Sequence, residues 1–416
     1  MQAVFADCVL GDMMKIRKYA VLVLGATLVL FSGCRRNESS VPRRFSKKQI
    51  ALTVWESLDG PDVFIKQAAE KYTEMHPDIE VDFVNVEPNV AVAQFQEDAP
   101  KGVGPDLFTG AHDNLGVLVG GGFILPSEDP EEIKKQVLGS CSRALTYNGT
   151  LYGYPVSAET YALFYNKALI SENEVPSSWE ELAAFVKNFN AHHPGKQGFV
   201  MDVANAYYTF IFTTANGNRL FGQFGTETSR SNLNTPDAVR GMKFFQSLHS
   251  AVSLPSSEMS TATADAAFQS GNAALHITGP WNIKNFSEAG VQFGVAALPS
   301  LPGESVPAAS FSGTRAVFVS AFSEHPKEAA DFAKFLISPE MQQLRFRLTG
   351  AMPSINTNVN SQYIAGFLKQ LEYAFPMPSV PEMGQYWTVM NSASARIWDG
   401  ASVEQELGRA DMQISR

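Results

Sequence analysis

The stretch from residue 50 to residue 85 switches between two hydrophobic periodicities, and this alternation constrains the fold more than any other feature. Residues 51–55 form a short apolar run that predicts a strand. Pro61 then stands at a favoured first-turn position, and apolar residues recur at helical spacing over residues 64–75. Residues 79–83 alternate apolar and acidic side chains, which is typical of a second strand. Strand, helix and strand in this order predict a βαβ unit with a right-handed crossover.

The same pattern recurs further along the chain. Ser178 and Glu181 form a capping-box signature ahead of an amphipathic helix. Thr235-Pro236 and His325-Pro326 open two more helices, and we expect Pro339 to end the second of these. Alternating helices and strands predict α/β lobes whose ligand crevices lie at the carboxyl ends of strands. With 45% hydrophobic residues over this length, two cores can be filled, so two lobes are expected.

Residues 1–33 are typical of a secretory signal. A basic stretch beginning at Met14 leads into an uncharged run over residues 20–31 and then into small residues. The run is shorter than the roughly 20 residues that a permanent membrane helix needs. Asp7 and Asp12 precede the basic stretch and suit a signal poorly, so we expect Met14 to be the true start. The chain is therefore expected to be exported.

Cysteine usage and charge exclude several classes of protein. Cys8 precedes the signal, Cys34 ends it, and Cys141 stands alone, so no internal disulfide is expected. No Cys/His spacing suggests a metal site. Residues 34–48 are rich in Ser, Arg and Lys and read as a flexible tether. The net charge of -10, with no basic stripe beyond this tether, argues against nucleic-acid binding.

Two resemblances to known families sharpen the interpretation. Ser32-Gly33-Cys34 resembles the lipobox of bacterial lipoproteins, with Phe31 where Leu is usual, which implies lipid attachment at Cys34. Spaced segments from about residue 50 to the C-terminus resemble the maltose/maltodextrin-binding branch of the extracellular solute-binding proteins of ABC importers. In chain order these segments are Gly104-Pro105-Asp106, Ala111-His112-Asp113, Tyr147-Asn148-Gly149, Tyr165-Asn166-Lys167, Gly279-Pro280-Trp281 and Met377-Pro378.

The second resemblance implies a two-lobed periplasmic-binding-protein-like fold of type II, with discontinuous lobes and a central cleft. The implied lobes are residues 46–157 with 314–362, and residues 160–303 with 364–416. The crossings near residues 156–160 and 310–314 are the expected hinges. The implied function is to bind a sugar, an oligosaccharide above all, by hinge closure and to deliver it to a membrane ABC permease. The implied protein is a monomer, is held to the membrane by its lipid, and needs no cofactor or metal.

A sugar cleft needs aromatic platforms flanked by groups that donate and accept hydrogen bonds, because a pyranose has apolar faces and a rim of hydroxyls. Trp281 follows the apolar run of residues 273–277 and is the leading ligand contact. The resemblance adds three further aromatic residues, three carboxylates and two amides: Tyr207, Tyr208 and Trp387; Asp59, Asp113 and Glu159; Asn205 and Asn391. The alternatives are core packing for the aromatic residues and helix caps or solvated charges for the carboxylates.

Departures from the maltodextrin-binding pattern leave the identity of the sugar open. Gly110 stands where an aromatic residue is usual, and Gly60 where a lysine is usual. Asn205 replaces a glutamate, while Asn114 and Asn391 replace basic residues. The cleft near Gly110 is therefore expected to be roomier and less charged than in a maltose binder.

Three other functions compete with a sugar importer's binding protein. The ligand could be a solute other than a sugar, Asp113 and Glu159 could serve as the carboxylate pair of a glycosidase, or the chain could be a surface adhesin with a macromolecular partner. His112 is interpreted as a buried histidine with satisfied hydrogen bonds, because no G-x-S-x-G elbow accompanies it.

Overall fold

The computed structural model of the chain describes residues 50–58, 60–356 and 361–415. The expected signal, the tether with Cys34, and Asp59 lie outside the described residues. None of the helices in the described ranges combines the length and apolar character that crossing a membrane requires.

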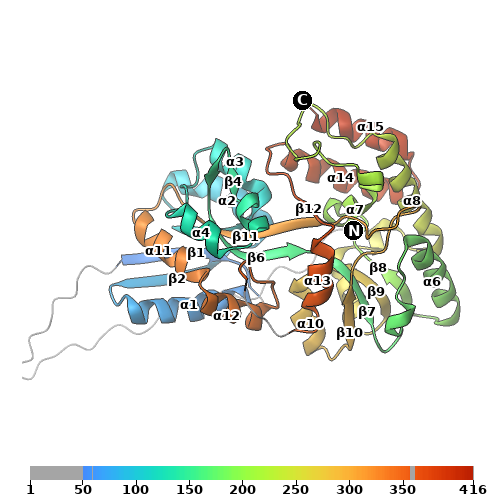
Figure 1. The fold of residues 1–416 in the computed structure, drawn as a ribbon, viewed down its shortest axis with the longest axis horizontal. Coiled ribbons are helices and arrows are strands. Elements are labelled where there is room, and N and C mark those ends of the chain that lie inside the picture. Colours follow the sequence, from blue (N-terminus) through green and yellow to red (C-terminus); the bar gives the residue numbers. More distant parts are fainter. Residues whose placement is uncertain (1–49, 59, 357–360, 416) are drawn as a thin grey trace, which may run out of the picture. The chain divides into compact units, whose positions relative to one another are not determined.

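The predicted βαβ unit is confirmed at the start of the first sheet. Strand β1 (Ile50–Glu56) leads through α1 (Pro61–Met75) into β2 (Ile79–Asn85), which pairs with β1 in parallel. On its other side β1 pairs in parallel with β3 (Leu107–Ala111). The carboxyl ends of β1 and β3 therefore lie at the same edge of the sheet, and Figure 1 shows β1 and β2 side by side next to α1.

Three further strands complete this six-stranded sheet. Strand β11 (Phe311–Val319) runs antiparallel to β3, and β6 (Tyr154–Thr160) runs antiparallel to β11. The short β12 (Phe375–Pro376) pairs in parallel with the start of β11. The order along the main path is β12-β11-β3-β1-β2, with β6 paired to β11.

Helices on the first sheet bury its apolar side chains. Besides α1 these are α2 (Pro88–Asp98), α11 (Pro326–Leu336) and α12 (Pro339–Thr349), joined by the short α3 (Leu115–Gly120), α4 (Pro130–Gln136) and α5 (Gly139–Ala144) and by the hairpin strands β4 (Thr146–Tyr147) and β5 (Thr150–Leu151). Phe64, Phe108 and Phe332 are fully buried in this core.

The expectation that Pro339 ends a helix is wrong in its details. Helix α11 already ends at Leu336, and Pro339 is instead the first residue of α12. A proline lacks a backbone N–H, and the first turn of a helix has no partner for that group anyway. The side chain of Ser338 caps α12 by accepting a hydrogen bond from the N–H of Met341.

The second sheet has four strands in the order β10-β7-β9-β8. They are β7 (Ala162–Asn166), β8 (Gln197–Val200), β9 (Ala273–Thr278) and β10 (Phe293–Ala296). Strands β8 and β9 are parallel, whereas β7 is antiparallel to both of its neighbours. The carboxyl ends of β8 and β9 therefore share one edge with the start of β7.

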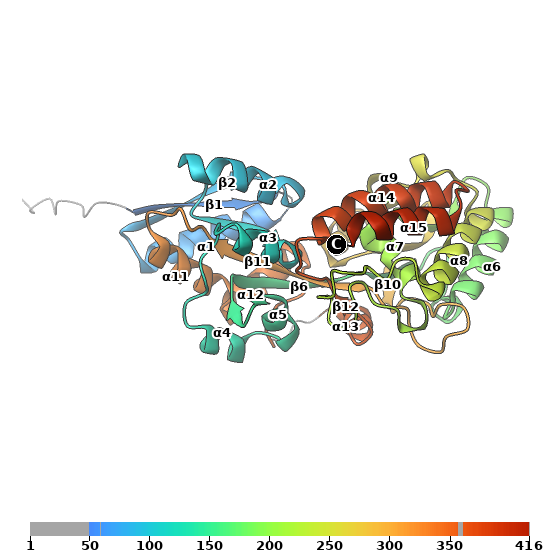
Figure 2. The ribbon, with the colours of Figure 1, turned by 90° about the horizontal axis from the view of Figure 1, so that it is seen from above.

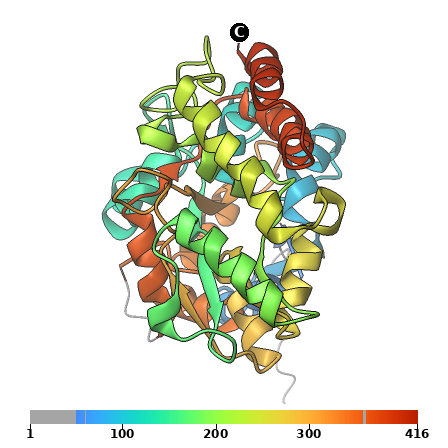
Figure 3. The ribbon, with the colours of Figure 1, turned by 90° about the vertical axis from the view of Figure 1, so that its right-hand side faces the viewer.

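Helices cover the second sheet as they cover the first. They are α6 (Trp179–His192), α7 (Ala206–Thr213), α8 (Pro236–Val252), α9 (Thr261–Gln269), α10 (Ile283–Glu288), α13 (Ile364–Leu371), α14 (Met383–Trp398) and α15 (Val403–Ile414). Figure 2 shows α14 and α15 side by side, and Figure 3 shows α6 in green and α8 in yellow-green across the outer face. The predicted capping box of Ser178 and Glu181 is confirmed at the start of α6.

The chain passes between the two sheets on adjacent strands. Only Tyr161 separates β6 of the first sheet from β7 of the second. Strand β11 pairs with β6 antiparallel, and it begins at Phe311 in the core of the second sheet and ends at Val319 in the core of the first. Two sheets with separate cores, joined by paired crossing strands, form a two-lobed α/β fold; the exact limits of the lobes and the hinges remain predictions.

Candidate ligand-binding site

The loops at the carboxyl ends of the strands carry the candidate residues, as expected of α/β sheets. His112 and Asp113 follow β3 directly, and Trp281 lies three residues beyond the end of β9. Asn205 follows β8 and caps α7. Glu159 stands next to the end of β6, where β6 passes into β7.

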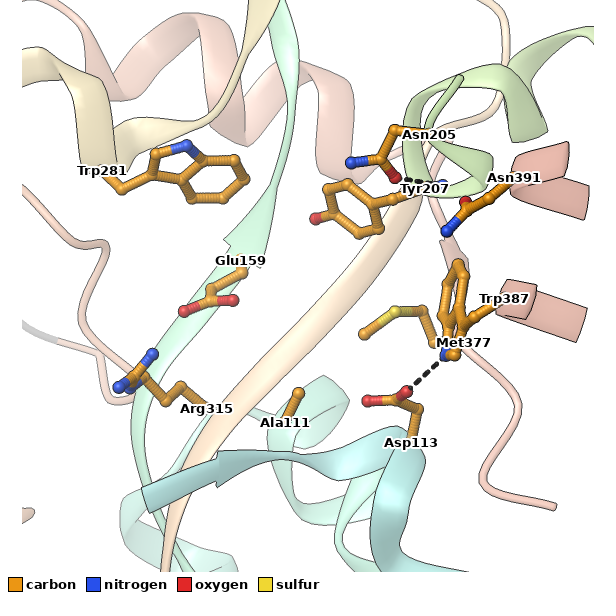
Figure 4. A pocket seen from close by; sticks show the side chains of 10 residues that line it. All are labelled: Ala111, Asp113, Glu159, Asn205, Tyr207, Trp281, Arg315, Met377, Trp387 and Asn391. Carbon is orange, nitrogen blue, oxygen red and sulfur yellow. Dashed lines mark hydrogen bonds between the residues drawn. The ribbon is translucent and has the colours of Figure 1, made fainter. Parts of the chain in front are cut away.

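These loops, together with side chains from β6, β11, α7 and α14, enclose a pocket with a volume of about 440 Å3 (Figure 4). This volume lies in the range of about 300–1,000 Å3 that is typical of small-molecule sites. Seven of the predicted residues line the pocket, namely Asp113, Glu159, Asn205, Tyr207, Trp281, Trp387 and Asn391. Three further residues, Ala111, Arg315 and Met377, complete its wall.

Tyr208 is a predicted ligand contact that does not line the pocket. Its side chain is only 4% exposed, packs against Tyr161 with ring centroids 5.3 Å apart, and is hydrogen-bonded to Thr278. Successive residues on a helix point about 100° apart, so Tyr207 reaches the pocket while Tyr208 reaches the core. The expectation for Tyr208 is therefore corrected to a core position.

Trp281 is placed as a platform rather than as a core residue. It is 36% exposed, whereas Trp179 and Trp398 are fully buried. Its indole covers Gly279 so closely that a Cβ atom there would lie 2.1 Å from the ring, which only glycine permits. The ring of Tyr207 lies 6.3 Å from it between centroids, so two aromatic faces border the pocket.

Trp387 and Asn391 reach the pocket from one face of α14, because residues four apart on a helix lie above one another. The indole Nε1 of Trp387 donates a hydrogen bond to Oδ2 of Asp113 at 3.0 Å. This bond joins α14, which covers the second sheet, to the loop after β3 of the first sheet. It fixes the orientation of the indole relative to the pocket.

The two amides of the pocket use their oxygens on the protein. Oδ1 of Asn205 accepts from the N–H of Tyr207 at 3.0 Å, and Oδ1 of Asn391 accepts from the N–H of Ala206 at 2.7 Å. Both oxygens thus satisfy free N–H groups in the first turn of α7. The Nδ2 groups of both amides remain available as hydrogen-bond donors to a ligand (Figure 4).

Burial controls the protonation of the neighbouring pair His112 and Asp113. Burial lowers the pKa of His112, and it raises the pKa of the Asp113 carboxyl against the opposing effects of His112 and of the Trp387 hydrogen bond. Nδ1 of His112 accepts from the N–H of Thr314 at 3.2 Å, so Nε2 carries the proton and donates to the carbonyl of Met377 at 3.0 Å. The sequence predicted a buried histidine with satisfied hydrogen bonds, and both ring nitrogens of the fully buried His112 do have a partner.

A buried group of charges lies beneath the pocket. Glu56, at the end of β1, forms an ion pair with Arg315 of β11 and lies 3.6 Å from Nη1 of Arg345 of α12. Burial by itself would raise the pKa of Glu56, but the two guanidinium groups hold it below its usual range. Thr109 Oγ1 also donates to Glu56 at 2.9 Å.

Comparisons with known proteins agree with this architecture. Residues 67–366 match the family described as bacterial extracellular solute-binding protein. The chain belongs to this family. The solute-binding protein is 29% identical over 409 residues to a galactooligosaccharide-binding protein of Bacillus subtilis, covering 95% of this chain and 96% of that one. It is 24% identical over 408 residues to a maltooligosaccharide ABC transporter solute-binding lipoprotein of Streptococcus pneumoniae, covering 94% of each.

Solved structures resemble the solute-binding protein over nearly their full length. A cyclo/maltodextrin-binding protein complexed with maltotetraose has a TM-score of 0.76 and 34% identity, over 89% of this chain and 98% of that one. A Thermus thermophilus maltotriose-binding protein bound with maltotriose has a TM-score of 0.79 and 27% identity, over 87% and 98%.

Sequence reasoning missed three pocket residues of the solute-binding protein, Ala111, Arg315 and Met377. Arg315 had a usable signal, because it is the only charged residue in the strand Phe311–Val319. Gly110, by contrast, was expected beside the cleft but does not line it. It is buried next to the ring of Phe318, and the single methyl group of Ala111 forms the wall instead.

The described residues contain no group of three or more His, Cys, Asp or Glu side chains placed to hold a metal ion. The pocket of the solute-binding protein instead offers aromatic rings, carboxylate acceptors and amide or guanidinium donors. Burial, assisted by the nearby Glu159, raises the pKa of Tyr207 well above its ordinary value, so its hydroxyl stays protonated and can also donate.

Proposed function

We propose that this protein is the sugar-binding component of an ABC importer, that it holds an oligosaccharide in the described pocket, and that it delivers the sugar to the membrane permease. The two lobes, with limits near 46–157 with 314–362 and 160–303 with 364–416, close over the ligand by rotation at the crossing strands. The free energy of ligand binding shifts this open/closed equilibrium.

The chemistry of the pocket is the observation that carries the proposal. Trp281, Tyr207 and Trp387 supply faces for the apolar sides of sugar rings. The carboxylates of Asp113 and Glu159 accept from hydroxyls, while the amides of Asn205 and Asn391 donate to them. A pocket for a polyamine would need a cluster of carboxylates in place of this mixture of aromatic faces and amide donors.

A second pocket favours an oligosaccharide over a single sugar. It has a volume of about 360 Å3 and shares Glu159, Trp281 and Arg315 with the first pocket. A ligand that fills both must therefore have more than one ring. The names of the relatives, which bind galactooligosaccharides, maltooligosaccharides, maltotriose or maltotetraose, support the same class of ligand.

The proposal includes export and a lipid anchor at Cys34, and it describes a monomer that works without a cofactor. Export is supported by the signal-like residues 1–33 and by membership of an extracellular family. Metabolic labelling with a radioactive fatty acid tests the anchor, because only the chain with Cys34 intact should take up label. Equal labelling of a Cys34→Ala variant would contradict it.

Thermal unfolding in the presence of candidate ligands tests the function. The purified protein is melted with maltotriose, maltotetraose and β-1,4-galactotriose, and in parallel with glutamate and spermidine. A ligand at 100 times its Kd stabilises the folded state by about 2.7 kcal/mol, so one of the sugars should raise Tm clearly. A rise in Tm with glutamate or spermidine and with none of the sugars would show that the ligand is not a sugar. Release of shorter sugars on incubation with the protein would indicate a glycosidase.

A further inference from the structure

Arg315 lies where the two pockets meet. Among the residues that the structure describes, it is the only cation that lines the larger pocket, and together with Glu159 and Trp281 it also lines the smaller one. Figure 4 shows these three side chains along one side of the pocket, with the guanidinium group facing the Glu159 carboxylate, and Tyr207, Asn205 and Asn391 on the other side. A ligand that extends through both pockets has to pass this side.

The guanidinium group is held rigidly from below. Its Nη2 donates to the carboxylate of Glu56, to Ser57 Oγ at 3.2 Å and to Thr109 Oγ1 at 3.2 Å. In the described part of the chain every hydrogen bond of this guanidinium group passes through Nη2. The planar guanidinium group is thus fixed through Nη2, and its Nη1 has no hydrogen-bond partner among these residues.

Glu159 faces Arg315 without forming an ion pair with it. Among the described residues its carboxylate accepts a hydrogen bond from Ser157 alone, whose Oγ donates to Oε1 at 3.1 Å. The ion pairs of Arg315 in the same residues involve Glu56 alone, so its nitrogens lie beyond 4.0 Å from the carboxylate oxygens of Glu159. A fixed donor and a fixed acceptor therefore face each other across a gap wider than one direct hydrogen bond.

We propose that Arg315 and Glu159 act as a donor–acceptor pair that binds the same sugar hydroxyl where the two pockets meet, and that Arg315 thereby helps to determine specificity. A hydroxyl donates one hydrogen bond and accepts others, so it can bridge the pair without either residue moving. An analogue that lacks this hydroxyl leaves both charged groups unpaired, which penalises it strongly. The inference rests on the proposed binding of a sugar.

The charge arrangement supports a role beyond holding Glu56. Arg345 also faces Glu56, so two guanidinium groups share one contacting carboxylate. Glu159 also acts electrostatically on Arg315, although the two side chains are not in contact. Arg315 therefore carries charge that Glu56 alone does not neutralise, and this charge is directed at the ligand space.

A double-mutant cycle tests the pair in the full processed protein. Of the three sugars named above, the tightest binder is titrated by calorimetry into wild type, Arg315→Met, Glu159→Gln and the double variant. Because each residue would form a hydrogen bond to the sugar through a charged group, each single change should weaken the affinity for the sugar roughly 10- to 100-fold. If both residues bind one hydroxyl, the double variant should be no more than about 3-fold weaker than the weaker single variant. If the loss of affinity in the double variant equals the product of the two single losses, the two residues do not bind one hydroxyl and the inference is wrong.

Stability measurements separate binding from folding. The two side chains make no direct contact and interact only through their charges, so the coupling between their effects on the Tm of the ligand-free protein should be small compared with the coupling in affinity. A merely structural pairing would give equal coupling in both. If Arg315→Met does not fold, Arg315→Lys replaces it: a lysine can neutralise Glu56, but its single nitrogen cannot also reach the ligand. Full affinity in Arg315→Lys would refute the inference.

A matched control and a second ligand complete the experiment. Arg396→Met removes an arginine that pairs with Glu406 away from both pockets, and it should leave the affinity unchanged. One monodeoxy analogue of the bound sugar should bind to wild type at least 10-fold more weakly than the parent sugar does. Arg315→Met should bind this analogue and the parent sugar equally well. If none of the monodeoxy analogues behaves in this way, the inference is contradicted. If wild type binds none of the three sugars, the proposed function fails and the inference fails with it, whereas binding without dependence on Arg315 rejects the inference alone.

Discussion

Replacing Trp281 by alanine should weaken sugar binding and leave the ligand-free fold largely intact. The side chain is 36% exposed, and a tryptophan presents on the order of 250 Å2 in all, so a stacked sugar can cover about 90 Å2 of the indole. At roughly 25 cal/mol per Å2 this area is worth about 2 kcal/mol, or about a 30-fold change in Kd.

The free energy of unfolding of the ligand-free protein should change less than the free energy of binding does. The indole forms part of the pocket wall, so its removal enlarges a space that water already reaches and creates no closed cavity. We expect a decrease of about 1 kcal/mol in the free energy of unfolding, against about 3–5 kcal/mol for Trp398→Ala, whose indole is buried beside Phe245.

Denaturant melts of the ligand-free variants and calorimetric titration with the tightest-binding sugar provide the assay. The platform role of Trp281 is refuted if Trp281→Ala loses as much stability as Trp398→Ala while its affinity is unchanged. Fluorescence gives an independent measurement, because Trp55, Trp179 and Trp398 are buried away from the ligand. The ligand-induced shift in emission should therefore decrease in Trp281→Phe, and the remaining shift should come from Trp387, which also lines the pocket.

Two further predictions concern stability. Gly241→Ala should destabilise the protein by about 1–3 kcal/mol in denaturant melts, because the new Cβ would lie 1.9 Å from the carbonyl oxygen of Phe212, whereas Gly384→Ala, with open space around it, should be neutral or stabilising. Burial lowers the pKa of His112 from 6.5, so as the pH falls the unfolded chain takes up this proton before the folded protein does. The free energy of unfolding should therefore decrease below about pH 6.5, by at most roughly 1.4 kcal/mol per pH unit. His112→Gln should flatten this dependence between pH 7 and 5.5, and parallel curves for both proteins would contradict the assignment.

Local chemistry allowed much of the fold to be predicted from the sequence. The helix from Pro61 and the strands around it follow from periodicity and proline placement alone, and the structure confirms them. Pro339 shows the limit of this reasoning, since a proline can end one helix or begin the next. Only the cap provided by Ser338, placed by the preceding chain, decides between the two.

The pocket could be predicted only in part, because the direction of a side chain depends on packing. Tyr207 and Tyr208 are the same residue type in neighbouring positions, yet Tyr207 lines the pocket, whereas Tyr208 is buried and hydrogen-bonded to Thr278. Arg315 was missed because its partner Glu56 is 259 positions away in the sequence. Such a pairing depends on β1, β3 and β11 lying in one sheet, and a single sequence does not show that register.

Asn205 illustrates how one side chain can serve both the fold and the ligand, and this can be tested by a single-atom exchange. Its Oδ1 caps α7 through the N–H of Tyr207, while its Nδ2 remains free to donate to a sugar hydroxyl. Asn205→Asp keeps the capping oxygen, and aspartate and asparagine cap helices about equally well, so the free energy of unfolding should change by less than about 0.5 kcal/mol. The donor, however, becomes an acceptor, so a hydroxyl that accepted from Nδ2 now meets a carboxylate oxygen, and affinity should fall roughly 10-fold or more. Asn205→Ala is the matched comparison, because it should lose about 1 kcal/mol of stability along with the cap. Unchanged affinity in Asn205→Asp would show that the amide nitrogen of Asn205 does not contact the ligand, and its role would then be to cap α7.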